Sequence, residues 1–444
     1  MADADTIAAI ATPPGVGGIG VIRISGPRAL AVAESLTDSR LETGRIQLRD
    51  FLDADGSAID QGLVLCFRGP RSFTGEDVVE LQGHGGPVLQ EMLLARLLDL
   101  GCCLARPGEF SERAFLNGKL DLTQAEAIAD LIESGSQAAA RAAMKSLQGA
   151  FSRRIHDLVD AVIDLRAFVE AALDFAEEEI DFLGESDILQ RLQSLIGDTE
   201  TILDEAERGR LLNEGLTVAI AGRPNAGKSS LLNRLAGYDA AIVTDIAGTT
   251  RDVIREHIAL KGIPLHIIDT AGLRDSDDPV EQEGIRRAWR EIEQADAVLM
   301  LIDARSGETD EDRAILERLA DCAVTRVYTK ADLLSPGQTP PQDGLLISSH
   351  SGQGMDALID RIVGHAGEGG TEASTFLARQ RHVDALQRAR EALLQARRVF
   401  AETASGELMA EDLRQAQQAL SEITGEFTTE DLLGRIFGSF CIGK

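Results

Sequence analysis

The sequence predicts a multidomain protein: an N-terminal α+β domain, a discontinuous helical domain, and an α/β domain inserted into the helical one. The 444 residues suffice for about three domains at roughly 150 residues each. Proline is absent between Pro107 and Pro224, where the composition favours helices. Short apolar runs typical of buried strands begin near residue 216. The predicted domain boundaries are 1–118, 119–214, 215–370 and 371–444.

The composition is ordinary for a folded protein but strongly acidic. With 44% hydrophobic and 26% charged residues, a fibrous or mostly disordered chain is excluded. Lys and Arg number 44 against 73 Asp and Glu, a net charge of -29, which argues against coating nucleic acid by bulk charge. Any polyanionic partner must therefore meet a local basic patch.

Cysteine usage and the N-terminal residues predict the compartment. The five cysteines lack the C-x-x-C spacing of zinc or redox sites. The first residues are acidic where a leader would be basic, and no apolar run reaches the roughly 18 residues of a membrane span. We therefore expect a cytoplasmic protein with no membrane association.

In the N-terminal domain, short β-like runs alternate with turns. The runs are IGVIRIS (19–25), LVLCF (63–67) and DVVELQG (77–83). The glycine-rich run GVGGIG (15–20) precedes a strand and does not open a helix, so it predicts a turn and not a dinucleotide-binding loop.

Two helical segments flank the α/β domain. Residues 122–212 are rich in Ala, Leu, Glu, Gln and Arg with apolar positions at helical spacing, and the chain is helical again after the glycine-rich linker 364–370. Because inserted domains usually have neighbouring termini, we expect the two segments to pack together as one domain. The alternative is two separate helical domains.

The α/β domain should contain a buried parallel sheet. Its expected strands are LTVAIAG (216–222), PLHIIDT (264–270), AVLMLID (297–303), VTRVYTK (324–330) and GLLISS (344–349). The first strand leads through GRPNAGKS (222–229) into an apolar helix, the context that a P-loop requires. Such a loop directs backbone N–H groups at phosphates, with Lys228 on the β- and γ-phosphates and Ser229 on Mg²⁺.

Two further motifs favour guanine as the base. Asp-Thr-Ala-Gly at 269–272 ends a strand, where the carboxylate supports Mg²⁺ through water and the glycine senses a γ-phosphate. In Thr-Lys-Ala-Asp at 329–332, Asp332 can accept both N1–H and the exocyclic amine of guanine. Thr329 replaces the usual Asn. This replacement puts one supporting hydrogen bond of the motif in doubt, but it does not change the predicted choice of base. Ser348-Ser349-His350 stands where GTPases place a base-contacting loop.

The residue after the Asp-x-x-Gly motif is Leu273, which cannot orient the attacking water as a Gln would. Hydrolysis must therefore be assisted in another way.

Together, Asn225, the segment TDIAGTTRD (244–252) and the terminal Cys441-Ile-Gly-Lys resemble the MnmE (TrmE) family of tRNA-modifying GTPases over essentially the whole chain. The resemblance implies that K⁺ replaces an arginine finger, held by Asn225 with Thr244, Ile246 and Thr249. It also implies that Thr250 joins Ser229 on Mg²⁺.

The family's water-orienting glutamate matches Glu281, for which the alternative is a solvated residue at a helix start. Family GTPase domains dimerise across the nucleotide. The predicted catalytic residues are Glu281, Cys441 and Lys228. The predicted GTP-binding residues are Asn225, Ala226, Gly227, Lys228, Ser229, Ser230, Thr244, Asp245, Ile246, Ala247, Gly248, Thr249, Thr250, Asp269, Thr270, Ala271, Gly272, Thr329, Lys330, Ala331, Asp332, Ser348, Ser349 and His350.

The family's N-terminal domain resembles folate-binding one-carbon domains and forms a constitutive homodimer. The residues expected to contact the folate are Arg23, Glu80, Lys119 and Lys444. The Glu80 carboxylate would accept hydrogen bonds from the amino-pyrimidine edge of the pterin, and the cations would suit the glutamate tail of the folate. The alternative for Arg23 and Glu80 is an ordinary surface position, and His84 is interpreted as structural. Cys441 would bring a thiol to this pocket as nucleophile or proton carrier, or else belong to a tail packed for dimer stability.

The implied function is GTP-dependent installation of a carboxymethylaminomethyl or aminomethyl group at carbon 5 of the wobble uridine of certain tRNAs. The family takes the one-carbon unit from 5-formyl- or 5,10-methylene-tetrahydrofolate and works with the flavin- and NADH-dependent partner MnmG (GidA). The alternative is a regulatory or assembly GTPase without chemistry of its own. The terminal thiol and ammonium favour the first, because a pure switch does not need them.

Overall fold

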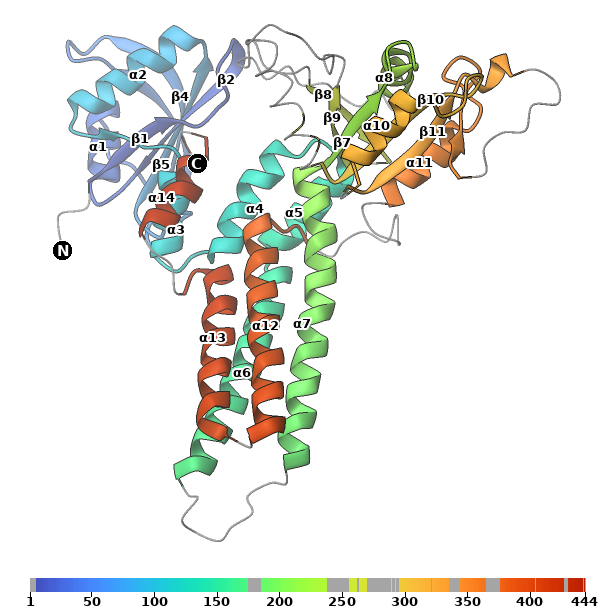
Figure 1. Cartoon of the computed structure of the whole chain (residues 1–444). Coiled ribbons are helices and arrows are strands. Elements are labelled where there is room, and N and C mark those ends of the chain that lie inside the picture. Colours follow the sequence, from blue (N-terminus) through green and yellow to red (C-terminus); the bar gives the residue numbers. More distant parts are fainter. Residues whose placement is uncertain are drawn as a thin grey trace, which may run out of the picture. The chain divides into compact units, whose positions relative to one another are not determined.

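The computed structural model (Figure 1) forms two compact units, each assembled from separate pieces of the chain. The first unit contains 1–129, 147–195 and 391–444, and the second contains 130–146 and 196–390. The structure describes residues 5–174, 185–237, 255–261, 263–269, 289, 292, 295–320, 322–334, 343–364, 376–403, 405–426, 430–441 and 443.

A six-stranded sheet forms the N-terminal part of the first unit. Its strands are β1 (Ile7–Ile10), β2 (Gly17–Ser25), β3 (Ile46–Leu52), β4 (Ala58–Phe67), β5 (Val78–Gly85) and β6 (Cys103–Leu104). The order is β3-β4-β5-β2-β1-β6, antiparallel throughout except for β1 and β6. The three strands predicted here are confirmed. The prediction of a turn at 15–20 is partly wrong, because β2 already begins at Gly17.

Helices cover both faces of this sheet, as its alternating side chains require. On one face, α1 (Ala29–Thr37) and α2 (Pro87–Asp99) bury the inward residues of β2, β4 and β5. On the other face, which we call the outer face, α3 (Glu109–Leu116) places Phe110 against Ile7 and Ala9 of β1. The outer face carries Arg23 and Glu80.

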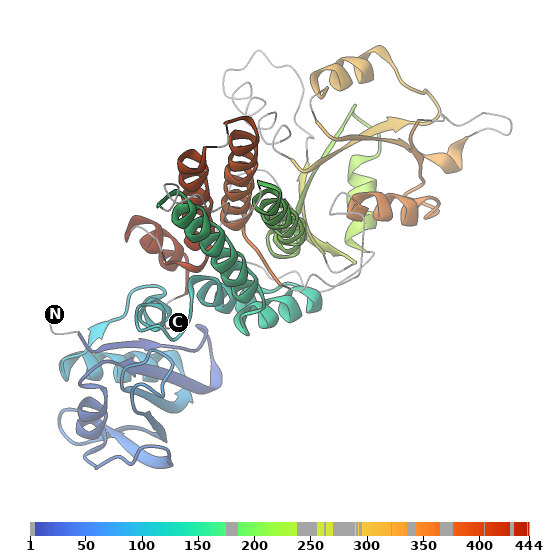
Figure 2. The same ribbon diagram turned by 90° about the horizontal axis from the view of Figure 1, so that it is seen from below.

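The first unit also contains helices from both helical segments. These are α4 (Leu122–Glu133), α6 (Ala150–Asp174), α13 (Gly406–Thr424) and α14 (Glu430–Gly438), with parts of α7 (Glu185–Glu214) and α12 (Gln380–Thr403). Figure 2 shows the long helices end-on and packed side by side. Arg166 of α6 donates to Gln417 of α13, and Arg397 of α12 donates to Gln193 of α7. Segments from either side of the inserted domain therefore pack together.

The second unit holds the α/β domain. Its strands are β7 (Leu216–Gly222), β8 (Arg255–Leu260), β9 (Ile263–Asp269), β10 (Ala297–Asp303), β11 (Val324–Thr329) and β12 (Leu345–Leu346). The order is β12-β11-β10-β7-β9-β8, parallel except for β8. Its described helices include α5 (Gln137–Leu147), α8 (Lys228–Ala236), α10 (Asp310–Arg318) and α11 (Met355–Gly364), with a 3₁₀ turn η1 (Ala331–Leu333).

The central strands of this sheet are apolar on both sides. The side chains of β7 and β10 alternate between two cores, one on each face of the sheet. One core includes residues of α8 and α11, and the other includes Trp289, Ile292 and Leu319. This arrangement is why both strands are continuous apolar runs in the sequence. It also brings the carboxyl ends of β7, β10 and β11 to one edge.

The predicted multidomain architecture with an inserted α/β domain is confirmed. Next to the insertion, Asp130 accepts a hydrogen bond of 2.6 Å from Arg379, and the Leu377 N–H donates to the Ser146 hydroxyl at 2.8 Å. These bonds again join the two helical segments. The four domain boundaries remain predictions. Among the helices that the structure describes, none combines the length and apolar character needed to cross a bilayer.

Candidate functional site

The P-loop lies between β7 and α8, at the carboxyl edge of the parallel sheet. Parallel sheets bind ligands at this edge, and α8 presents its N-terminal N–H groups there. Gly222, Asn225 and Gly227 have φ 144°, 63° and 100°, so the loop has a positive φ at three positions. A Cβ on Gly222 would lie 2.5 Å from the Leu301 carbonyl oxygen, which explains why the loop begins with glycine. The Asn225, Ser229 and Ser230 side chains are exposed.

The Lys228 ammonium is held by the loop that it follows. Its Nζ donates to the carbonyl oxygens of Gly222 at 2.6 Å and Arg223 at 3.1 Å. These bonds fold the Lys228 side chain back over the P-loop. In this position the ammonium could also bind phosphate oxygens.

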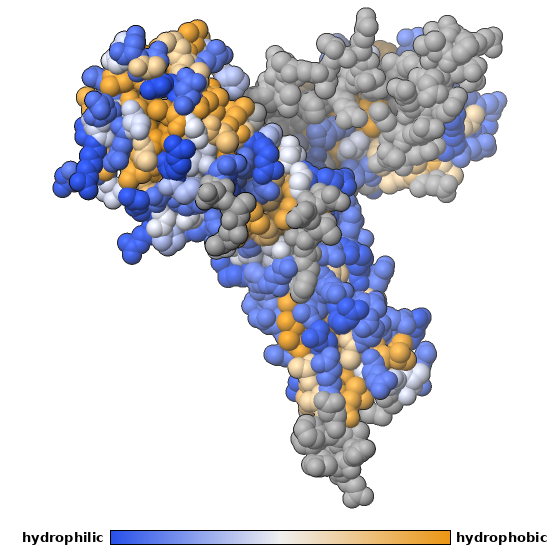
Figure 3. Space-filling model, turned by 90° about the vertical axis from the view of Figure 1, so that its left-hand side faces the viewer, coloured by the Kyte–Doolittle hydropathy of each residue, from blue (hydrophilic) through white to orange (hydrophobic). Residues whose placement is uncertain are grey.

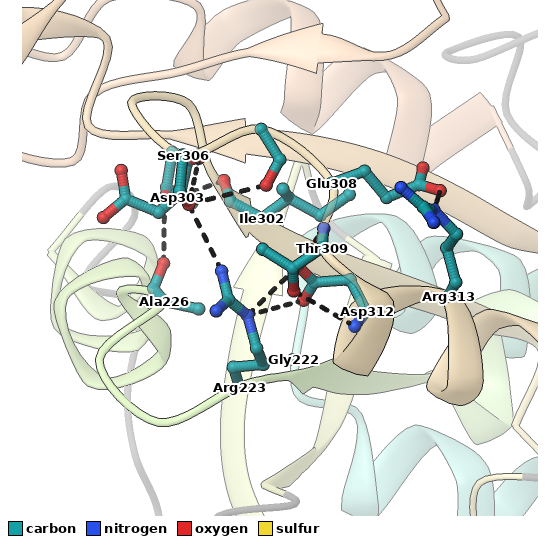
Figure 4. Close-up of polar contacts among 12 residues, drawn as sticks. Gly222, Arg223, Ala226, Ile302, Asp303, Ser306, Glu308, Thr309, Asp312 and Arg313 are labelled. Carbon is teal, nitrogen blue, oxygen red and sulfur yellow. Dashed lines mark hydrogen bonds and ion pairs between the residues drawn. The ribbon is translucent and has the colours of Figure 1, made fainter.

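A buried ion pair fixes the start of the loop to α10 (Figure 4). Arg223 Nε lies 3.1 Å from Oδ1 and 3.0 Å from Oδ2 of Asp312, whose side chain is 0% exposed. Asp312 also accepts from the N–H and hydroxyl of Thr309 in the capping box of α10. Arg223 NH2 donates to the Ser306 hydroxyl at 3.2 Å. The carboxylate is therefore buried with several donors.

The Thr329-Lys330 pair supports the P-loop from the end of β11. The Thr329 hydroxyl lies 2.7 Å from the Ala226 carbonyl oxygen, and Lys330 Nζ donates to the Asn225 carbonyl at 2.6 Å. Lys330 Nζ also lies 2.8 Å from the carboxylate of Asp303, at the end of β10. Hydrogen bonds from Arg305, and then from Lys330, hold the pKa of Asp303 well below its usual range. The carboxylate therefore stays ionised and fixes Lys330.

The Asp332 carboxylate is held by the loop that follows β12. The fully buried Ser348 hydroxyl donates to Asp332 Oδ1 at 2.5 Å and accepts from the Ser351 N–H at 3.0 Å. The hydrogen bond from Ser348 lowers the pKa of Asp332. The carboxylate remains exposed on η1, as a group that reads a base must be. Ser349 is half-buried and His350 is exposed on the same loop.

The structure thus gathers the predicted residues 225–230, 329–332 and 348–350 around one edge of the sheet, with Asp269 ending β9 beside β7. The other predicted residues of the GTP and K⁺ sites lie outside the described residues. They are Thr244, Asp245, Ile246, Ala247, Gly248, Thr249, Thr250, Thr270, Ala271, Gly272 and Glu281.

A second candidate site lies on the outer face of the N-terminal sheet. Arg23 of β2 and Glu80 of β5 are directly paired across the two strands, and Arg23 donates to Glu80 Oε1 through Nε at 3.1 Å and NH2 at 2.9 Å. The guanidinium also lies over the rings of Phe73 and Phe110, with 5.4 and 5.7 Å to the centroids. Both side chains are about four-fifths buried, at 21% and 19% exposure. The alternative of ordinary surface positions does not fit this geometry.

The end of the chain reaches the same face. Phe437 and Phe440 of the α14 segment pack in an edge-on pair, 5.4 Å between centroids, in a core with Leu122 and Phe115. The Cys441 carbonyl then accepts from the Gly108 N–H at 3.4 Å, and the Gly443 carbonyl lies 3.5 Å from Arg23 NH1.

The space around the last glycine is tight. A Cβ on Gly443 would lie 2.4 Å from the Ile10 carbonyl oxygen of β1, so the tail lies directly on the strand. Cys441 itself is exposed. The tail is therefore anchored by backbone and phenylalanine contacts, and the exposed Cys441 lies two residues before the glycine whose carbonyl meets Arg23.

The remaining N-terminal candidates lie further along the loops. Lys119 Nζ donates to the Pro70 carbonyl at 2.8 Å, on the loop that carries Phe73. His84 is exposed, and its Nδ1 lies 2.7 Å from Asp60, a contact within the sheet that agrees with its structural interpretation. Lys444 lies outside the described residues.

Sequence reasoning missed the residues that support the P-loop from β10 and α10, namely Arg223, Asp303, Ser306 and Asp312. Two signals were present: Thr309-x-x-Asp312 has the spacing of a capping box, and Asp303 ends an apolar strand. Neither signal indicates contact with Arg223, because that depends on β10 lying beside β7.

Comparison with known proteins identifies the family. The family model for the MnmE helical domain matches residues 122–441, and the model for the GTP-binding protein TrmE N-terminus matches residues 6–119. The tRNA modification GTPase MnmE of Pseudomonas entomophila is 55% identical over 451 residues, covering 99% of each chain. The chain belongs to the MnmE family of tRNA modification GTPases.

A second relative also matches this chain over its full length. The MnmE of Yersinia pseudotuberculosis serotype O:1b is 55% identical over 454 residues, covering 100% of both chains. Among solved structures, a variant of Aquifex aeolicus Era bound to GDP and aluminium fluoride matches 40% of this chain and 66% of its own, with 26% identity and a TM-score of 0.28. The two MnmE relatives confirm the resemblance seen in the sequence to the MnmE family over the full length.

We predict that Arg223→Ala destabilises the second unit by about 3 kcal/mol, the lower end for a broken buried ion pair, since Arg223 is 25% exposed. The reason is that Asp312 stays buried without its cation. The chain's single tryptophan, Trp289, is buried in this unit, so its fluorescence during urea unfolding reports on the second unit alone.

Arg313→Ala is the matched control, because Arg313 forms exposed pairs with Glu308 and Asp310. It should change the free energy of unfolding by no more than about 0.5 kcal/mol. Equal effects of the two variants would contradict the role given to the Arg223–Asp312 pair.

Proposed function

We propose that this GTPase installs a carboxymethylaminomethyl or aminomethyl group at carbon 5 of the wobble uridine of certain tRNAs, in the cytoplasm. The one-carbon unit comes from 5-formyl- or 5,10-methylene-tetrahydrofolate, and a flavin-dependent partner of the MnmG (GidA) type supplies the redox chemistry. The observation that carries the proposal is the terminal Cys441 segment bound to the Arg23–Glu80 face. A GTPase acting only as a switch, the alternative, has no need for a thiol placed there.

The folate pocket is proposed on this face, with contacts from Arg23, Glu80, Lys119 and Lys444. The Arg23–Glu80 pair is about four-fifths buried, and the Arg23 guanidinium lies over two phenylalanine rings, which suits a flat heterocycle with donor and acceptor edges. When bound, the tetrahydrofolate supplies the one-carbon unit. The chain's own groups orient it and place the Cys441 thiol beside it.

Cations are proposed for the nucleotide site. Mg²⁺ would be held by the Ser229 hydroxyl and Thr250 together with substrate phosphates, the sparse protein ligation typical of this ion. K⁺ would be held by Asn225, Thr244, Ile246 and Thr249. Asn225 is exposed at the left-handed turn of the P-loop, so its amide oxygen can meet a cation beside the phosphates. Glu281 would orient the attacking water in place of a Gln.

A homodimer through the N-terminal domain is part of the proposal. Figure 3 shows apolar residues gathered on the surface of this domain. Leu48 of the edge strand β3 lies directly opposite Leu63 of β4, and Ile46 and Phe67 continue this exposed row at 68% and 38% exposure. An exposed apolar edge of this kind in a folded protein is usually covered by a partner. A second copy of the chain is the partner that the family implies.

The test of the proposed function combines assembly and folate binding. Light scattering should give the mass of two chains, and 5-formyltetrahydrofolate, followed by its absorbance in equilibrium dialysis, should bind to the purified protein. Glu80→Gln should weaken binding by about tenfold, because a neutral amide replaces an acceptor for two N–H donors. Absence of folate binding with intact GTPase activity would favour the switch alternative.

GTP turnover should depend on K⁺. We expect hydrolysis to be at least about tenfold slower in NaCl than in KCl at equal ionic strength, since the cation replaces an arginine finger whose effect is on the order of 10³ or more. Na⁺ is too small to bridge the same oxygens, whereas ammonium and Rb⁺ should substitute in part. Steady-state phosphate release measures the rates, and equal rates in KCl and NaCl would refute the K⁺ site.

Cys441→Ser should abolish uridine modification with MnmG and tRNA while leaving the K⁺-stimulated GTPase rate and the melting temperature unchanged. The reason is that the backbone of Cys441 anchors the tail, and serine keeps that bond. Cys103→Ser, at another exposed cysteine of the first unit, is the matched control and should retain modification. Nucleoside analysis of the tRNA provides the readout. Full modification by the Cys441 variant would exclude a chemical role for the thiol.

A further inference from the structure

The guanine motif of this chain begins with a residue whose hydrogen-bonding capacity is already used. Thr329 is 2% exposed, and its Oγ1 lies 2.7 Å from the Ala226 carbonyl oxygen and 3.2 Å from the Ile302 carbonyl oxygen. A hydroxyl has one proton to donate. Both neighbours are acceptors only, so the proton of Thr329 is committed to the protein backbone.

An asparagine at this position behaves differently. A side-chain amide has two N–H donors, so one can bind a P-loop carbonyl while the other remains for an acceptor on the ligand. Of the two acceptors that guanine presents in the major groove, N7 and O6, N7 lies outside the Watson–Crick edge. Replacing the amide by a hydroxyl keeps the bond to the P-loop and removes the second donor.

The position of Thr329 makes it a support of the phosphate loop. A Cβ added to Gly227 would lie 3.6 Å from the Thr329 side chain, so this side chain packs directly under the glycine of the P-loop. Turning the hydroxyl toward a base would leave the buried Ala226 carbonyl without this donor, which disfavours the change.

We propose that Thr329 supports the P-loop through its hydrogen bond to the Ala226 carbonyl and does not contact the base. This chain therefore recognises guanine through its Watson–Crick edge, and N7 of the base does not contribute to binding. The inference rests on the proposed binding of guanine by Asp332. The Ser348 hydroxyl, which bonds Asp332 Oδ1 at 2.5 Å, is the positioning group for that carboxylate. Base recognition then depends on the Ser348–Asp332 pair, and P-loop support depends on Thr329.

The experiment compares GDP with 7-deaza-GDP, in which a carbon replaces N7. Dissociation constants come from competition with a fluorescent GDP analogue on the full chain. The wild-type chain should bind the two nucleotides with affinities within about twofold of each other. Thr329→Asn should bind GDP more tightly and prefer it over 7-deaza-GDP by about fivefold or more, the effect of one net hydrogen bond.

Thr329→Val and Thr329→Ser separate the two roles. Valine keeps the shape but lacks the hydroxyl, so both nucleotides should bind more weakly by the same factor. Serine keeps the hydroxyl and should resemble the wild type, and it provides a readout if the asparagine variant does not fold. A wild-type or serine chain that binds 7-deaza-GDP fivefold more weakly than GDP would overturn the proposal.

Inosine diphosphate, which lacks the exocyclic amine of guanine, distinguishes failure of the inference from failure of the base assignment. It should bind more weakly than GDP to the wild-type chain and to every Thr329 variant, because Asp332 is unchanged. If IDP and GDP bind equally well, Asp332 does not read the base, and both the base assignment and the inference built on it fall. If IDP binds weakly but 7-deaza-GDP also does, only the inference falls.

Discussion

The nucleotide site depends on one constraint: the carbonyl oxygens of the P-loop must be satisfied while its N–H groups remain directed at phosphates. A buried backbone acceptor without a donor is costly, and this loop has little regular structure to supply one. Side chains supply it instead. The Lys228 ammonium donates to the carbonyl oxygens of Gly222 and Arg223. The Lys330 ammonium donates to the Asn225 carbonyl, and the Thr329 hydroxyl donates to the Ala226 carbonyl. Two of these three side chains come from the end of β11, so the phosphate loop and the guanine motif form one hydrogen-bonded unit.

The cations around the P-loop are held in place by neighbouring carboxylates. Lys330 is fixed by Asp303, whose pKa is lowered by Arg305 and Lys330, and Arg223 is fixed by the buried Asp312. In both pairs a cation near the loop is neutralised by a carboxylate from β10 or α10. Arg223 and Lys330 are therefore each paired with a carboxylate, in a chain whose net charge is -29.

Much of the fold could be predicted from the sequence, because its signals are local. The apolar runs of β7, β10 and β11, the GRPNAGKS loop and the proline-free helical segments are short-range patterns. The Arg223–Asp312 pair and the Ser348–Asp332 bond could not be predicted. The first depends on β10 lying beside β7, a pairing that skips β8 and β9. The second depends on the side-chain geometry of the segments that follow β11 and β12. Similarly, only the family resemblance indicates Arg23 and Glu80, and no local pattern predicts that the Arg23 guanidinium lies over the rings of Phe73 and Phe110.

The N-terminal site follows the same physical rule with different groups. The Arg23 guanidinium has five N–H donors and two aromatic faces beside it, and it binds the Glu80 carboxylate and the Gly443 carbonyl together. One largely buried cation thus connects a central pair of strands with Gly443 near the end of the chain. Because the tail is held through its backbone and two phenylalanines, the identity of residue 441 is not needed for anchoring. Packing therefore does not require a cysteine at position 441.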